Sequence, residues 1–253
     1  MAKTKVVQEV EDLDFLEDNA GEGYDEAKSS IPRIVILQAN PAGQYIEGSD
    51  EYIPGAKPGY FFLTSTKEVY KEPQFIPIMA RRAWLEWIPQ ENGGGFRGKH
   101  RPNSLQIIGD LYKGAKALNG NDIVEALEIY GLIPGKEADG PILLSLTNSS
   151  IKYGDLWVDK NKTVRTPKGN IPPIYGSVWV LKTGLNKNKK GQWFSIGVDK
   201  SPLVERKRWI TKKEYMEYVK PTLEYLETAI PFIEDRDPGQ VALPAPQEEE
   251  VPF

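Results

Sequence analysis

The sequence predicts a mainly β protein with two helices, and three observations support this class. Residues that favour strands, the β-branched and aromatic types, gather in short runs. Glycine and proline are frequent, at 23 and 20 of 253 residues, and they fall between these runs as turn residues do. Helical spacing behind a helix-start residue is found at two places only. A chain of this length can bury one generous core, so we expect one main domain.

The first β-type runs are short and surround a long loop. Residues 33–37 form the first run, and the loop over residues 41–59 is punctuated by proline and glycine. Residues 60–65 and 68–70 flank a short turn, which predicts a hairpin.

A long strand is expected over residues 75–88, with a bend where Arg81 and Arg82 interrupt its alternation. It leads into a basic loop, 93–101, that begins with three consecutive glycines. Ordering three glycines costs backbone entropy, so we interpret the loop as a mobile finger. Its glycines lack the spacing of a nucleotide P-loop.

The middle of the chain is expected to hold a helix and one or two strands. Asp122 opens a short helix whose apolar residues fall at helical spacing and which ends at Gly131. A strand follows over residues 141–147, and residues 151–158 are interpreted as a further strand. Residues 160–173 form a basic loop that contains proline.

Two late strands, 175–181 and 192–198, are expected to pair as a hairpin with residues 187–191 as its turn. A capping box at residues 211–214 starts the second helix, and Pro221 is expected to kink it.

The charged residues are segregated along the chain, although the whole protein has a net charge of only −4. Residues 1–30 carry three Lys against nine acids, and residues 231–253 carry one Arg against six acids. The 28 basic and 21 acidic residues that remain give the body, 31–230, a net charge of +7. A basic body between acidic segments suits a protein that binds a polyanion.

The late hairpin combines aromatic and basic residues. Alternation places Tyr175 and Trp179 of the first strand, and Trp193 of the second, opposite the apolar face, where a flat ring could lie against them. Base stacking on such side chains contributes ~1–3 kcal/mol per base and tolerates any sequence. The alternative is that Trp179 and Trp193 form a cross-strand pair beneath a covering loop.

Residues 182–213 contain ten basic residues against Asp199 and Glu205, which favours a phosphate-binding surface. The finger adds further cations, and Trp84, which shares a strand face with Arg82, is an aromatic ligand candidate. The basic residues assigned to DNA are Lys182, Lys187, Lys189, Lys190, Arg206, Arg208, Arg82, Arg97, Lys99 and Arg101. The predicted helices lack the donors that reading of duplex base edges requires, so we expect single strands as the ligand.

The chain ends in Glu248, Glu249, Glu250, Val251, Pro252 and Phe253, behind a Pro-rich tether. A terminal Phe presents a ring and an α-carboxylate together, which a pocket with a basic lip can capture. This tip resembles the C-terminal tip of bacterial single-stranded DNA-binding proteins, with Glu in place of Asp and Val in place of Ile. The resemblance covers these six residues and the layout of basic body, tether and acidic tip. In arrangement the body is more similar to the larger single-stranded DNA-binding proteins of bacteriophages.

The resemblance implies sequence-independent binding and protection of single-stranded DNA during phage replication, recombination or repair, with the tip recruiting replication proteins. It also implies an OB-like antiparallel β-barrel with extended loops over residues 31–230, because closure removes exposed sheet edges and leaves a curved face for a strand. We expect residues 1–30 to be a disordered acidic arm, and residues 231–253 to be the tether and partner-binding tip. No catalysis and no cofactor are required, and a homo-oligomer is compatible with this function.

Two other functions fit the pattern: a phage structural or assembly protein, whose β-rich body and acidic arms serve protein contacts, and a carboxylate metal nuclease. The nuclease would use Asp155, Asp159 and Asp199, which lack a recognisable ligand spacing and are expected in solvated turns. The absence of cysteine and the single histidine, His100, exclude thiolate sites, Ser-His-Asp triads and multi-histidine metal sites. No apolar run has the length of a signal peptide or membrane span, so we expect a cytoplasmic protein, in the host cell if a phage encodes it.

Overall fold

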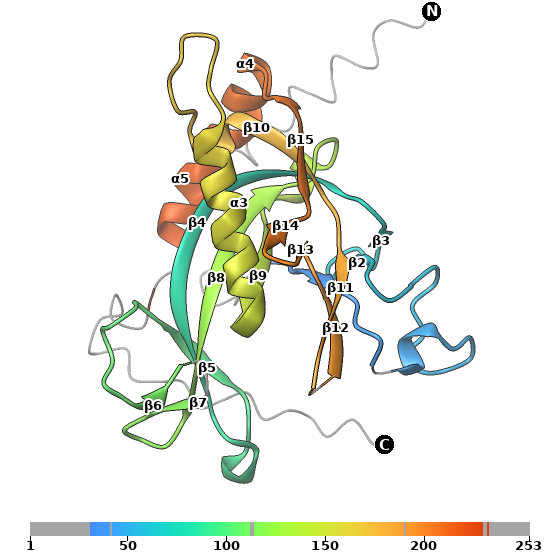
Figure 1. Cartoon of the computed structure of the whole chain (residues 1–253), viewed down its shortest axis with the longest axis vertical. Coiled ribbons are helices and arrows are strands. Elements are labelled where there is room, and N and C mark those ends of the chain that lie inside the picture. Colours follow the sequence, from blue (N-terminus) through green and yellow to red (C-terminus); the bar gives the residue numbers. More distant parts are fainter. Residues whose placement is uncertain (1–30, 41, 112–113, 190, 230–231, 233–253) are drawn as a thin grey trace, which may run out of the picture. The chain divides into compact units, whose positions relative to one another are not determined.

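The computed structural model describes residues 31–40, 42–111, 114–189, 191–229 and 232. The acidic segment 1–30 and the C-terminal tip therefore lie outside the described residues. Strands dominate the described part and form one eight-stranded sheet and three small sheets (Figure 1). This confirms the predicted mainly β class. None of the helices in this part of the chain has the length and apolar character that a bilayer crossing requires.

The large sheet has the strand order β15-β10-β4-β8-β7-β6, with β5 beside β4 and β9 beside β8. Its strands are β4 (Gln74–Trp87), β5 (Phe96–His100), β6 (Ile107–Asp110), β7 (Gly114–Ala117), β8 (Asp122–Leu132), β9 (Ile142–Thr147), β10 (Ser177–Leu181) and β15 (Val204–Trp209). The small sheets comprise β1 (Ile34–Ile36) with β2 (Phe61–Leu63) and β3 (Val69–Tyr70), β11 (Gly184–Asn188) with β12 (Gly191–Ser195), and β13 (Gly197–Val198) with β14 (Ser201–Pro202). The α-helices are α3 (Ile151–Thr163), α4 (Lys212–Glu214) and α5 (Lys220–Ala229).

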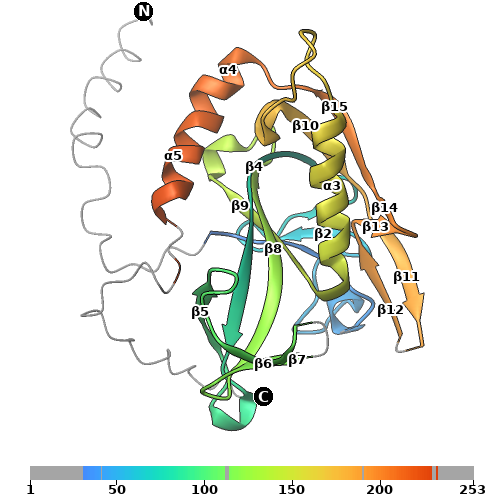
Figure 2. The same ribbon diagram turned by 60° about the vertical axis from the view of Figure 1, so that its left-hand side comes forward.

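The centre of the large sheet is a long antiparallel ladder between β4 and β8, which pair along nearly their whole length. Figure 2 shows both strands as long, bent ribbons. The register shifts between Pro77 and Met79, a bulge that accommodates a proline without a backbone N–H. The irregularity that the sequence predicts at Arg81 and Arg82 thus lies slightly earlier in the strand.

Glycine is required in β8 where the two strands approach beside this bulge. A Cβ atom on Gly131 would lie 2.3 Å from the carbonyl oxygen of Ile76 and 2.5 Å from the Phe75 ring. Any larger residue would force the ladder apart.

Helix α3 packs over the large sheet and supplies the aromatic centre of the core (Figure 1). Trp157 of α3 lies edge-on to Trp179 of β10, with ring centroids 6.1 Å apart, and its centroid is 6.0 Å from that of Phe75. Tyr153 approaches β13 so closely that a Cβ atom on Gly197 would lie 2.0 Å from its ring. Buried side chains of β1, β2, β8 and β9 complete this core.

The C-terminal helix begins at the predicted capping box, which is confirmed. The Glu214 N–H donates to Thr211 Oγ1 at 3.1 Å, and the Thr211 N–H donates to Glu214 Oε2 at 2.7 Å. A π-helical segment, Tyr215–Val219, joins α4 to α5 directly before Pro221. The widened turns provide the irregularity expected near a proline that lacks an N–H donor.

Two predictions of secondary structure in the middle of the chain were wrong. Residues 122–131 belong to strand β8 and not to a helix, because β8 lies between β4 and β9 and is buried from Ala126 to Leu132. Residues 151–158 belong to helix α3 and not to a strand. Short apolar runs fit either period, and tertiary contacts decide between them.

The late hairpin pairs differently from the prediction. Strand β12 pairs with β11, with Asn186 opposite Trp193, whereas β10 lies between β4 and β15. The segment 184–188, which overlaps the start of the predicted turn 187–191, is itself a strand.

The large sheet is open. Its path ends at β6 on one side and at β15 on the other, and no strand pair within the described ranges joins these ends. The predicted OB-like barrel is therefore not confirmed, although the antiparallel sheet and the two helical regions are present.

Removal of the Trp179 side chain should lower the free energy of unfolding by about 3–5 kcal/mol, because this indole is 0% exposed in the core. Trp193 is only half-buried, so Trp193→Ala is the matched control and should cost clearly less. Urea denaturation followed by circular dichroism measures both variants. Equal losses would contradict the assignment of Trp179 to the core.

Candidate nucleic-acid interface

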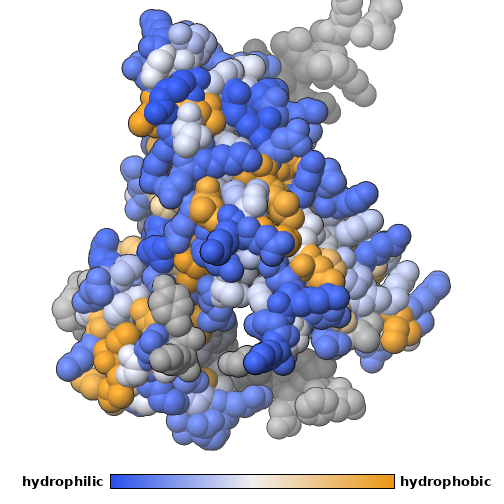
Figure 3. Space-filling model, in the orientation of Figure 1, coloured by the Kyte–Doolittle hydropathy of each residue, from blue (hydrophilic) through white to orange (hydrophobic). Residues whose placement is uncertain are grey.

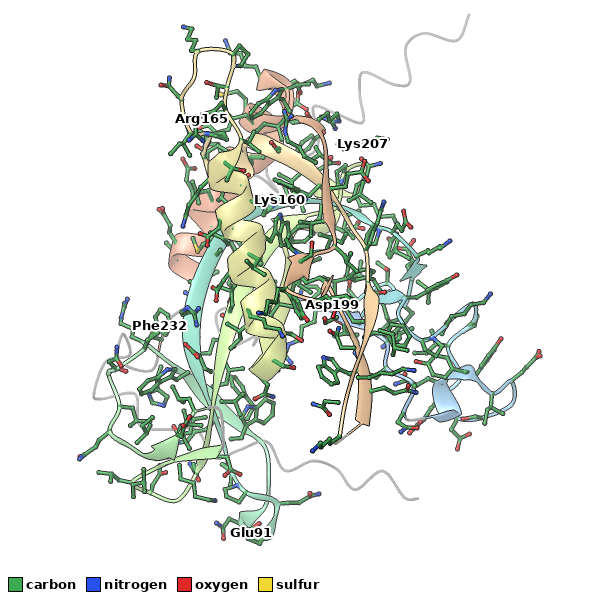
Figure 4. All side chains as sticks on the ribbon, in the orientation of Figure 1. Glu91, Lys160, Arg165, Asp199, Lys207 and Phe232 are labelled. Atoms are coloured by element: carbon green, nitrogen blue, oxygen red, sulfur yellow. The ribbon has the colours of Figure 1, made fainter. Side chains whose placement is uncertain are left out.

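Basic side chains gather where the end of α3, the loop after it and β15 meet. Figure 4 labels three of them: Lys160 on α3, Arg165 in the loop and Lys207 on β15. All three are exposed. The name basic ridge is used below for Lys160, Lys162, Arg165, Lys168, Arg206 and Lys207.

Backbone carbonyls hold part of the basic ridge in place. Lys160 Nζ donates to the carbonyl oxygen of Val204 at 2.6 Å, which ties the last turns of α3 to the start of β15. The Arg165 guanidinium donates to the carbonyl oxygen of Val164 at 2.9 Å. Hydrogen bonds to neutral carbonyls position these cations without cancelling their charge.

Carboxylates compensate little of this charge. Lys162 pairs with Asp159 at 3.0 Å, but both side chains are well exposed, and such a pair is weak. Among the described residues, no carboxylate lies within 4.0 Å of the charged nitrogens of the other five ridge residues. The ridge is therefore a surface of net positive charge.

The positive charge of the ridge also acts on Glu205, which directly precedes Arg206 in β15. Its pKa is held below the usual value, first by the hydrogen bond from Lys182 at 2.9 Å and further by the charges of Lys207 and Lys160. The side chain stays exposed, so a mobile anion at this surface would experience the same attraction.

An aromatic side chain lies within the ridge. The guanidinium carbon of Arg206 lies 3.7 Å from the ring centroid of Trp209, and Arg206 Nε donates to Ser177 Oγ at 3.0 Å. Pairing of β15 with β10 places Arg206 opposite Trp179 and Trp209 opposite Ser177, hence on one face of the sheet. Lys207 has no partner on β10, because the register shifts there. The half-buried Trp209 and the guanidinium form a flat platform of the kind on which bases stack.

The aromatic ligand candidates from the sequence do not gather at one surface. Trp179 and Trp84 are buried in the interior, so neither ring is accessible to a base in this structure. Tyr175 is half-buried and stacks on Tyr215 with centroids 5.6 Å apart. Burial and then Tyr215 raise the pKa of Tyr175. Trp193 is half-buried on the β11–β12 hairpin, away from strand β10.

The expected finger is strand β5, paired with β4, and its cations are engaged with carboxylates. Arg97 lies 2.9 Å from Glu86, and Lys99 lies 2.5 Å from Glu128. Arg82 on β4 likewise binds carboxylates on both sides, at 2.7 Å each, from Glu125 and Asp155. Arg101 lies just beyond β5 and is exposed.

The remaining basic candidates divide into paired and exposed residues. Lys182 pairs with Glu205, and Arg208 forms a two-pronged pair with Glu214 at 2.9 and 2.5 Å. Lys187 and Lys189 are exposed on the β11–β12 hairpin, and Lys190 lies outside the described residues. The partner-binding candidates Glu248, Glu249, Glu250, Val251, Pro252 and Phe253 also lie outside them.

The three aspartates considered for a metal nuclease have different partners and do not form one cluster. Asp155 binds Arg82, Asp159 binds Lys162, and Asp199 lies in the turn between β13 and β14 at φ 48°. Of the three, only Asp199 sits in a turn as predicted. The described part of the chain holds no group of three carboxylate or histidine side chains that could bind a metal ion.

The sequence alone assigns neither Trp209 nor the ridge residues of α3 and its loop to DNA binding. The run from Arg206 to Trp209, three cations and an aromatic residue, was a usable signal. Nothing in the sequence indicates that the end of α3 meets β15, because residues 151–158 favour a strand. The contact between these elements arises from the tertiary fold.

Glu86, near the C-terminal end of β4, is the centre of a buried hydrogen-bond network. Its carboxylate is 2% exposed and accepts hydrogen bonds from Asn119 at 2.9 Å, Asn121 at 2.7 Å and Arg97 at 2.9 Å, and it lies 2.7 Å from His100 Nε2. Burial by itself would raise the pKa of Glu86 above its ordinary value. The hydrogen bonds and the charge of Arg97 outweigh burial and hold the pKa at about 2.

This lowered pKa makes the protein less stable in acid. The stabilisation from ionised Glu86 is complete above the ordinary pKa of 4.5 and is lost as the pH falls towards 2. Glu86→Gln should therefore lower stability at pH 6 and flatten its decline between pH 4.5 and 2.5. Urea unfolding across this range measures the effect, and the exposed Glu91→Gln is the matched control. A decline as steep as in the unmodified protein would contradict the assignment.

Comparison with known proteins gives one relationship. A protein-family model described as "Pam3 phage gp34-like protein" matches residues 2–222. This match spans most of the chain and all of the basic ridge, and the acidic tip lies beyond it. No curated protein and no solved structure matches the chain.

Proposed function

Because the chain belongs to the Pam3 phage gp34-like protein family, we propose that it serves a phage as a single-stranded DNA-binding protein with the basic ridge as its phosphate-binding surface. The observation that carries this proposal is the set of exposed cations without carboxylate partners around Arg206 and Trp209. Such a protein would act in the cytoplasm of the host cell, and its function requires no catalysis.

The chemistry of the ridge favours single strands over duplex DNA. Side chains such as Lys160 and Lys207 neutralise phosphates wherever these lie, which gives affinity without sequence preference. Trp209 and Arg206 offer flat surfaces to a base, and only an unpaired strand exposes the faces of its bases. Binding would therefore be independent of sequence and sensitive to salt.

Loss of one ridge cation should weaken binding and reduce its salt dependence. Lys207→Ala should lower the slope of log affinity against log salt by about 0.7, the contribution of one phosphate contact on a single strand. The measurement is a titration with oligo-dT at several salt concentrations, followed by tryptophan fluorescence.

Lys116→Ala is the matched control for this experiment. Lys116 is an equally charged, exposed residue on β7 that pairs with Asp122. Its removal should leave the slope unchanged. Equal slopes for both variants, or no binding of oligo-dT at low salt, would overturn the assignment of the ridge.

We further propose that the acidic tip recruits replication proteins, as the resemblance to bacterial single-stranded DNA-binding proteins implies. Deletion of residues 248–253 should keep or raise the affinity for oligo-dT, because six residues with three carboxylates are removed and the ridge stays intact. The same deletion should abolish capture of replication proteins by the immobilised protein. A collapse of DNA affinity would instead make the tip part of the binding site.

A role in phage assembly is the second candidate, favoured by an apolar surface on the β6–β7 hairpin. Ile108 of β6 is 62% exposed and Leu118, just after β7, is 64% exposed. Figure 3 shows apolar side chains gathered over this region. In the described part of the chain β6 pairs on one side only, and an open edge strand can accept a protein partner. The oligo-dT titration separates the two functions, because protein assembly needs no salt-dependent binding of DNA.

A further inference from the structure

A second basic feature lies on the other side of the sheet, between α5 and β4. It is a cleft of about 460 Å³, within the range of small-molecule sites, and Arg81, Arg82 and Arg101 line it together with Leu226, Glu227 and Phe232. Figure 4 labels Phe232 beside β4. This cleft is separate from the basic ridge.

Two guanidinium groups lie against the ring of Phe232, which lines this cleft. The guanidinium carbon of Arg81 is 4.5 Å from its ring centroid, and that of Arg101 is 4.7 Å away. The ring is 7% exposed, and it packs on Ala83, Leu85 and Ala126 of the sheet. The name slot is used below for the place at the wall of the cleft where these two guanidinium groups and the sheet hold one flat aromatic ring.

The two arginines differ in their exposure to solvent. Arg81 is anchored from below, because its Nε lies 3.5 Å from Glu128, which is 1% exposed and also binds Lys99. Arg101 lies at the mouth and is exposed. One wall of the slot is thus partly buried on the sheet, and the other is accessible from solvent.

The chain that follows Phe232 carries acids close to the ring in sequence. Glu234, Asp235 and Asp237 come within five residues of it. A flat ring followed by anionic groups has the same chemical order as a nucleobase followed by its phosphates. A nucleotide unit carries both a flat ring, which can stack on a guanidinium group, and a phosphate, which can pair with one.

We propose that Arg81 and Arg101 form a base-stacking slot for single-stranded nucleic acid, which Phe232 fills in the free protein. This inference rests on the proposed function and adds a second contact for the same ligand. A base that enters the slot displaces Phe232 and stacks between the guanidinium planes, while its phosphate lies at the exposed side of Arg101. The slot and the basic ridge would then hold one strand at two places.

The experiment uses the full-length protein and oligo-dT that carries one 2-aminopurine, whose fluorescence is quenched by stacking. Phe232→Ala empties the slot and should raise the affinity by about fivefold or more and deepen the quenching. Arg101→Ala should lower the affinity and reduce the quenching. Arg101→Lys is the matched control: it keeps the charge but removes the planar group, so it should keep the salt dependence and lose the quenching.

A strand with abasic sites separates stacking from charge. The effect of Phe232→Ala should disappear on this strand, whereas the effect of Lys207→Ala should remain. If oligo-dT binds with the salt dependence of the ridge but Phe232→Ala and Arg101→Lys behave like the unmodified protein, the slot is wrong and the ridge stands. If neither the unmodified protein nor Phe232→Ala binds oligo-dT at low salt, the proposed function itself fails.

Discussion

The antiparallel ladder between β4 and β8 is the constraint on which the other elements depend. Its two strands contribute residues to the aromatic core and to two smaller buried clusters of the described part of the chain. The elements α3, α5, β5, β7, β9 and β10 all pack or pair on them. The close approach at Gly131 fixes the register, which decides the face on which each later residue lies. Arg81 and Arg82 illustrate this: adjacent in sequence, one faces Phe232 and the other faces α3.

The same ladder explains why charged residues occur inside the sheet. Glu86 and Glu128 are both nearly inaccessible, and a buried carboxylate is tolerated only with cations and hydrogen-bond donors around it. Their partners Arg97 and Lys99 both lie on β5, the strand that pairs with β4. These cations hold β5 against β4, so a segment rich in glycine and positive charge forms an ordered strand.

Local signals in the sequence predicted what local chemistry decides. The capping box at Thr211 and the mainly β class follow from side chains close in sequence, and the structure confirms both. Residues 122–131 and 151–158 exchanged their predicted types because burial on two sides favours a strand and burial on one face favours a helix, and burial depends on the tertiary fold. Trp179 shows the same limit. Its position in a strand was predictable, but the helix that covers it was not.

The distribution of carboxylate partners, more than the number of basic residues, distinguishes a binding surface in this protein. Arg82 and Lys99 inside the sheet each meet a carboxylate, and Arg208 of β15 binds Glu214 of α4, so the charges of these cations stabilise the fold. Lys162 has an exposed carboxylate partner, whereas the other ridge cations meet neutral oxygens or solvent, and the charges of Lys160 and Lys207 act on Glu205. A chain with a net charge of −4 can therefore present a positive surface, because 15 of its 36 acids lie in the two terminal segments and several acids of the body pair with cations of the sheet. A count of charges along the sequence identifies the basic body, but only the pairing identifies the face that is free to bind a polyanion.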